Sequence, residues 1–178
     1  MSTGPLFPGY AAIPAPAEDP FRRKWDAVRS FLDVEHEAVE LSLDAVAAFN
    51  ERINREAAYV SEPLGLDNWQ TPSQTMTSRS GDCEDFAILK YAVMKQSGLP
   101  ETAMRLVFGQ IKSLSGNLGH AWLAVWLEDA WRVLDNKFDQ LIEPADYINW
   151  LPVKAAWSDQ LVLFGRLITI NEIIAHHG

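Results

Sequence analysis

One segment of the chain is apolar on nearly every side and constrains the fold more than any other. It runs from Cys83 to Gln96 and is followed by Ser97-Gly98-Leu99-Pro100, where a glycine with a proline just beyond is a typical helix stop. A helix without a polar face has to be covered on all sides. We therefore predict that residues 83–96 form the central helix of a single domain.

The segments before this helix have a helical period, and those after it have the period of strands. Asp19-Pro20 is a typical helix start, and apolar residues at helical spacing follow to residue 32 and again over about 36–58. Helices followed by strands predict an α+β fold with an antiparallel sheet. The predicted strands cover 104–112, 120–127, 131–134 and 161–168, with a loop at 115–119 and a hairpin turn at Glu128-Asp129. Residues 61–81 are predicted to form a loop or a loosely helical approach to the central helix.

The N-terminal segment differs in composition from the rest of the chain. Residues 1–18 are rich in proline, alanine and glycine and show neither period, so we predict a flexible leader followed by one domain over 19–178. The first 20 residues contain no basic stretch followed by an apolar one, so no signal peptide is visible. The sequence alone therefore fits a cytosolic protein, or an exported one given without its leader.

Charge limits the partners that this chain can bind. Its formal net charge is -9, which argues against nucleic acid or an anionic membrane surface as a partner, because binding to phosphates needs clustered Lys and Arg. No apolar run is long enough to span a membrane. A cationic substrate or a metal ion suits the acidic balance better.

The only cysteine, Cys83, begins the predicted central helix. A thiol attacks as its anion, and the positive end of a helix lowers a cysteine's pKa. A lone cysteine can also be a small packing residue. The neighbouring Asp82, Glu84 and Asp85 favour an accessible position, because acidic side chains are rarely buried unless they are paired.

A cysteine nucleophile needs a base and a group that orients the base. Of the four histidines, His36 lies among charged residues and two lie at the C-terminus, which leaves His120. If Glu128-Asp129 are the two turn residues, Asp135 shares a face with His120 on the adjacent strand, within reach of a hydrogen bond. A one-residue slip would move Asp135 to the other face. The alternative is a solvated histidine and a turn-forming aspartate.

Three blocks of sequence resemble the bacterial transglutaminase-like cysteine proteinases. They are Gly81-Asp82-Cys83-Glu84-Asp85-Phe86, Gly119-His120-Ala121 and Val133-Leu134-Asp135-Asn136, and the upstream Asp67-Asn68-Trp69-Gln70-Thr71-Pro72 is also similar to the family. The resemblance covers about residues 20–165. It implies a papain-like fold in its transglutaminase variant, in which a cysteine-bearing helix packs on an antiparallel sheet that supplies the histidine and the aspartate.

The resemblance also implies the chemistry. Cys83 would be the nucleophile, His120 the general base and then acid, and Asp135 the orienting carboxylate of a cysteine peptidase that works through a thioester. The backbone N–H of Cys83 would help to hold the oxyanion, with Trp69 and Gln74 as candidate side chains. Acyl transfer to an amine, as in a transglutaminase, and a binding module without turnover are the alternatives.

Cofactor and partners follow from the same resemblance. The best-known members are periplasmic, calcium-dependent proteases that cut large surface adhesins and release biofilm, which implies a protein substrate and an inhibitory membrane receptor. Asp82 and Glu84 match the calcium-binding positions of those proteins, and calcium prefers several carboxylate and carbonyl oxygens. The alternative is that Asp82 caps the helix while Glu84 and Asp85 complement its dipole.

Overall fold

The computed structural model describes residues 5–32, 41–63, 66–114, 116–147 and 149–167. Two short 3₁₀ turns, η1 (Glu101–Ala103) and η2 (Pro144–Asp146), interrupt the loops. The other elements, in chain order, are β1 (Tyr10–Pro14), α1 (Pro20–Arg29), α2 (Leu43–Glu56), β2 (Ala58–Tyr59), α3 (Pro72–Ser78), β3 (Ser80–Gly81), α4 (Cys83–Gln96), β4 (Met104–Ser113), β5 (Gly116–Leu127), β6 (Ala130–Asp135), β7 (Phe138–Ile142), β8 (Trp150–Trp157) and β9 (Gln160–Arg166).

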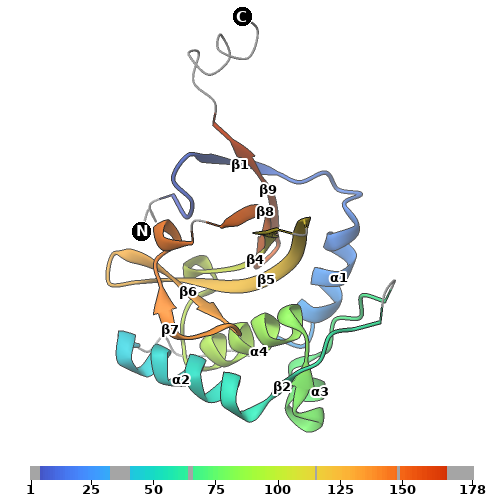
Figure 1. Cartoon of the computed structure of the whole chain (residues 1–178), viewed down its shortest axis with the longest axis vertical. Helices are drawn as coiled ribbons and strands as arrows, with labels where there is room; N and C mark the ends of the chain where they lie inside the picture. The colour runs from blue at the N-terminus through green and yellow to red at the C-terminus, as the bar shows by residue number, and fades with distance from the viewer. Residues whose placement is uncertain (1–4, 33–40, 64–65, 115, 148, 168–178) are drawn as a thin grey trace, which may run out of the picture.

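One antiparallel sheet forms the body of the molecule. Its strand order is β1-β9-β8-β4-β5-β6-β7, and β2 and β3 form a separate parallel pair. In Figure 1, α4 runs along the middle of the sheet beneath β5 and β6, with α1 and α2 on either side of it. This arrangement confirms the predicted α+β fold, in which all strands of the antiparallel sheet except β1 follow the helices.

The predicted central helix is confirmed as α4. Ile88 on α4, Trp25 on α1 and Leu123 on β5 belong to one buried cluster, and none of the three side chains is exposed. Gly98 has a positive φ of 93° just after the helix, which is the left-handed conformation that ends a helix and that glycine adopts at little cost. Burial on all sides explains why the segment has no polar face.

The hairpin between β5 and β6 has the predicted turn and register. Trp126 pairs with Trp131, and Ala124 pairs with Val133. Glu128 and Asp129 both have positive φ, 48° and 61°, as a two-residue type I′ turn requires. The turn therefore fixes which residues of β6 share a face with those of β5.

The N-terminal segment differs from the prediction of a flexible leader. Tyr10–Pro14 pairs with β9 at the edge of the sheet, and Leu6 and Phe7 are buried. The ring of Phe7 packs edge-on against Trp122, at 6.2 Å between centroids. Proline is tolerated in an edge strand because that strand pairs on one side only, so proline-rich composition did not exclude a strand here. The segment closes the sheet face opposite α4.

Four further strands were not predicted, namely β2, β3, β7 and β8, and α3 lies in the segment for which the prediction was a loop or a loosely helical approach. β5 also begins at Gly116 instead of His120, because Gly116 continues the pairing with Ser113 of β4. Part of the helix predicted at 36–58 and the end of the strand predicted at 161–168 lie outside the described residues. Among the helices that the structure describes, none has the length and apolar character needed to cross a membrane.

Candidate active site

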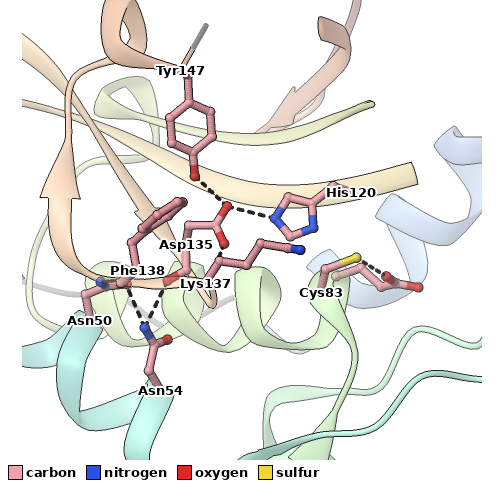
Figure 2. A network of polar contacts seen from close by, with 9 residues as sticks. Asn50, Asn54, Cys83, His120, Asp135, Lys137, Phe138 and Tyr147 are labelled. Carbon is pink, nitrogen blue, oxygen red and sulfur yellow. Dashed lines mark hydrogen bonds and ion pairs between the residues drawn. The ribbon is translucent and has the colours of Figure 1, made fainter. Parts of the chain in front are cut away.

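A cleft of about 380 Å³ lies at the first turn of α4. Cys83 and His120 both line this cleft, together with Gly109 and Gly119 of the two central strands. Figure 2 shows the side chains of Cys83, His120 and Asp135 in one region, with the imidazole between the thiol and the carboxylate. Cys83 and His120, which are far apart in the sequence, therefore face one accessible space, and the buried Asp135 lies behind His120.

His120 and Asp135 are in direct contact. His120 Nε2 lies 2.7 Å from Asp135 Oδ2, and both side chains are buried. This contact is the one that the hairpin register predicted. Burial alone would raise the pKa of Asp135, but hydrogen bonds from His120, Tyr147 and the Lys137 N–H, with the charge of His120, bring it below its usual range. Because Asp135 is ionised, Nε2 carries the hydrogen and Nδ1 is left for the cleft.

Two asparagines of α2 hold the turn that carries Asp135. The Asn54 amide donates to the backbone oxygens of Asp135 and Phe138, each at 3.0 Å. The Asn50 amide donates to the backbone oxygens of Phe138 and Asp139, at 2.8 and 2.9 Å. Because Asn50 is fully buried, its two bonds are shielded from water, and the bonds of both asparagines fix the position of the turn relative to α2.

The Cys83 thiol sits between two hydrogen-bonding partners. The backbone N–H of Ala121, the residue after His120, donates to Cys83, and the thiol donates to Glu84 Oε2 at 3.2 Å. Burial, followed by the charge of Glu84 and the hydrogen bond to it, raises the pKa of Cys83. The prediction that the helix start lowers this pKa is therefore wrong for this arrangement, because burial and the nearby carboxylates together outweigh the helix dipole. The thiol needs a base to take its proton.

The acidic residues beside Cys83 form two groups with different contacts. Asp82 lies within hydrogen-bonding range of Glu84, and its Oδ1 is buried without a hydrogen-bond partner among the described residues. Burial, then the hydrogen bond to Glu84 and its charge, and then the charge of Glu62, raise the pKa of Asp82 to about 7. Across the part of the chain that the structure describes, no group of three or more histidine, cysteine or acidic side chains is arranged to hold a metal.

Asp85 has a structural position. Its Oδ1 accepts the Gln70 backbone N–H at 2.7 Å, and its Oδ2 accepts the Gln70 amide at 2.9 Å and the Asp82 N–H at 3.2 Å. Asp82 and Asp85 form a reciprocal capping box at the start of α4. Asp85 therefore ties the segment before α3 to the helix that carries Cys83, and the capping role proposed for Asp82 is present.

The two side chains considered for the oxyanion hole do not offer a donor to the cleft. Trp69 lines the cleft, but its indole N–H donates to Asp67 Oδ1 at 3.0 Å. Gln74 is exposed and caps α3 together with Thr71, so the expectation for Gln74 is wrong. Trp69 instead stacks on Phe108 at 4.9 Å and forms an aromatic wall of the cleft.

Three residues that shape the site were not predicted from the sequence, namely Tyr147, Trp150 and Gly109. Tyr147 donates to Asp135 Oδ2 at 2.6 Å, and the Trp150 ring packs on His120 at 4.4 Å. Gly109 lies opposite His120 in the β4–β5 register, and a β-carbon there would collide with Trp122 and the Leu151 oxygen. A glycine in a predicted strand was the available hint of such a close approach.

A helix that begins with a cysteine and packs on an antiparallel sheet bearing a histidine is the architecture of the papain-like class of thiol hydrolases. The chain belongs to the bacterial transglutaminase-like cysteine proteinases (BTLCP), whose family model matches residues 27–154. It is therefore a cysteine peptidase, and its substrate is a protein.

Solved structures of the same fold include LapG of Legionella pneumophila. One LapG structure has a TM-score of 0.60 and 22% identity and covers 83% of this chain and 82% of that chain. The calcium-bound form has a TM-score of 0.61 at 19% identity, with 92% of this chain and 93% of that chain covered. The EGTA-treated form has a TM-score of 0.60 at 21% identity and covers 89% of each chain. No curated protein sequence matches the chain significantly.

Proposed function

We propose that this peptidase cleaves peptide bonds with Cys83 as nucleophile, His120 as general base and acid, and Asp135 as the carboxylate that orients His120. The observation that carries the proposal is the 2.7 Å contact between His120 Nε2 and Asp135 Oδ2. This contact leaves Nδ1 as the ring nitrogen on the side of Cys83 (Figure 2). Cys83 and His120 both line the cleft.

Acylation begins when Nδ1 of His120 takes the thiol proton as sulfur attacks the substrate carbonyl carbon. The carbonyl π electrons move to oxygen, and the N–H groups at the start of α4 face the oxyanion, since the first N–H groups of a helix have no intrahelical partner. The tetrahedral intermediate then collapses to a thioester. His120 gives its proton to the departing amine, and Asp135 holds the imidazolium in place.

Deacylation uses the same residues in reverse. Water attacks the thioester carbon while His120 accepts a proton from the water, and the proton then passes to the departing sulfur. An amine that replaces water at this step would give transfer instead of hydrolysis. The difference between the two reactions therefore lies in the products and not in the triad.

We expect Cys83→Ala to abolish cleavage, because no other described side chain in the cleft offers a thiol. The measurement is mass spectrometry of new N-termini in a proteome-derived peptide library, with and without a primary amine. Wild-type protein should produce free carboxyl ends with the amine present. Cleavage that persists in Cys83→Ala, at wild-type folding, would refute the role of Cys83, and carboxyl ends capped by the added amine would show acyl transfer to an amine instead of hydrolysis.

We further propose that Asp82 and Glu84 hold a calcium ion. Their carboxyl groups are within hydrogen-bonding range of each other, and Asp82 Oδ1 is buried without a partner among the described residues. Two adjacent carboxylates, one of which has an unpaired oxygen, fit a hard cation that takes oxygen ligands. A bound calcium ion would supply positive charge beside α4 and so neutralise the repulsion between the two carboxylates. One of the similar structures, LapG of Legionella pneumophila, is a calcium-bound form.

Calcium should raise the melting temperature of the wild-type protein, since a ligand that binds only the folded state stabilises it. We expect a rise of several degrees with calcium at about 100 times its Kd. Asp82→Asn combined with Glu84→Gln should remove the rise. The matched control is Asp44→Asn combined with Glu51→Gln on α2, which makes the same charge change far from the cleft. An equal calcium shift in both double variants would contradict the site.

The resemblance to the family suggests the biological substrate. We propose that it is a large surface adhesin outside the cytoplasm and that an inhibitory membrane receptor controls access to it. Among the residues that the structure describes, the cleft is lined by carboxylates at Glu62, Asp67, Asp82 and Glu84 and by no lysine or arginine. This charge favours a substrate segment that lacks acidic residues next to the cleaved bond.

A further inference from the structure

Tyr147 follows the 3₁₀ turn η2, between β7 and β8, and reaches the side of Asp135 away from Cys83. Its hydroxyl oxygen lies 2.6 Å from Asp135 Oδ2, the same atom that His120 Nε2 approaches at 2.7 Å. Figure 2 shows both contacts meeting at this one oxygen. Tyr147 is 6% exposed and Asp135 is 1% exposed, so water does not compete for either bond.

The direction of the Tyr147 bond is fixed by the surroundings. Burial, with the charge of Asp135 and the hydrogen bond to it, raises the pKa of Tyr147. The phenol therefore stays protonated and donates. The other oxygen, Asp135 Oδ1, accepts the backbone N–H of Lys137 at 2.7 Å. Three donors from three parts of the chain thus set the plane of the carboxylate.

Aromatic packing extends the same arrangement to the imidazole. The Tyr147 ring lies 4.4 Å from the Trp150 ring, and the Trp150 ring lies 4.4 Å from the His120 ring. Trp122 packs against both Tyr147 and Trp150, at 5.7 and 5.3 Å. The hydroxyl therefore belongs to a ring that is itself held in place, so its position is well defined relative to Asp135.

We infer that Tyr147 is a positioning residue: its hydroxyl holds the Asp135 carboxylate in the orientation that faces His120. Tyr147 and His120 both bond to Asp135 Oδ2, so each of the two bonds weakens the other. The inference rests on the proposed function of Cys83, His120 and Asp135. Without the hydroxyl, the Asp135 carboxylate keeps two donors and can turn together with the imidazole bonded to it, so His120 spends less time in the orientation that reaches the thiol. At the same time Oδ2 bonds to His120 alone, and that bond becomes stronger.

Two readouts separate positioning from a packing role. Tyr147→Phe should lower kcat about five- to fiftyfold with little change in KM, since it disturbs orientation and not substrate binding. The His120 Nε2–H proton, assigned by its loss in His120→Gln, should move downfield in the NMR spectrum as its bond to Asp135 strengthens. The matched control is Tyr91→Phe, which removes another buried hydroxyl, bonded to Glu101 at 3.0 Å, and should leave both readouts unchanged.

A second measurement keeps the ring and the fold. Protein grown with 3-fluorotyrosine carries a more acidic phenol, which donates more strongly to Asp135, so the His120 proton should move upfield. Movement in opposite directions for the two proteins supports the inference. It is overturned if the proton stays in place in either one, or if Tyr147→Phe has the kcat of the wild type. Hydrolysis that survives in Cys83→Ala would instead overturn the proposed function, and the NMR result does not depend on hydrolysis.

Discussion

Replacing His120 with alanine is expected to slow peptide hydrolysis by about 10³- to 10⁴-fold. The reason is the state of the nucleophile. Burial and Glu84 raise the pKa of Cys83, so the thiol keeps its proton until a base removes it during attack. In the proposed mechanism His120, which lines the cleft, is this base, and its Nε2 lies 2.7 Å from Asp135 Oδ2. The measurement is kcat/KM with a peptide identified as a substrate of the wild-type protein.

The His120→Ala variant also leaves a gap, because Trp150 packs on the imidazole at 4.4 Å. His120→Gln is the matched variant, since its amide can donate to Asp135 and fill part of the space but cannot act as a base. Both variants should lose hydrolysis to the same degree while the melting curve shows a folded protein. If either variant kept more than about a tenth of the wild-type rate, His120 would not be the base.

Lys90→Met is expected to raise the free energy of unfolding at pH 7 by about 3–5 kcal/mol. Lys90 is fully buried on α4, and its ammonium has no hydrogen-bond partner among the described residues. Burial lowers the pKa of Lys90 from 10.5 to about 7, although the charges of Asp135 and Asp139 act in the opposite direction. Methionine has a similar length and carries no charge to bury.

The pH dependence of stability tests the cause of this gain. Between pH 7 and 10.5 the unfolded chain binds a proton at Lys90 that the folded protein does not, so the destabilising contribution of Lys90 becomes smaller as the pH rises through this range. The advantage of Lys90→Met should shrink toward pH 10 and stay constant below pH 7. Chemical denaturation at several pH values measures it. Lys112→Met, at an exposed lysine of β4, is the control and should change stability by less than about 0.5 kcal/mol. An advantage that does not vary with pH would contradict the account.

Local pattern was enough to predict the elements that carry the candidate site. The all-round apolar character of residues 83–96 predicted α4, and the strand period on both sides of Glu128-Asp129 predicted the β5–β6 hairpin. The register of that hairpin placed Asp135 beside His120, because two strands joined by a two-residue turn have only one pairing for each choice of turn. The catalytic roles of these residues stay predictions.

The parts that were missed depend on contacts between distant segments. β1 forms because its backbone can pair with β9, about 150 residues later, and no local period in Tyr10–Pro14 indicates this. Asn50 sits in an apolar helical stripe, and its role appears only when α2 meets the turn after Asp135. Tyr147 belongs to a loop, where side-chain direction does not follow from spacing. The raised pKa of Cys83 depends on burial and on where the Glu84 carboxylate lies in space.

The central claim is that Cys83 forms a thioester with the substrate. The most direct test is mass spectrometry of the protein quenched in acid during turnover, followed by peptide mapping. The account predicts that the peptide containing Cys83 carries the mass of the N-terminal substrate fragment less one water, and that a neutral hydroxylamine treatment removes it. The same mass on another residue, or hydrolysis in rapid-quench samples that never contain an acylated Cys83, would contradict it.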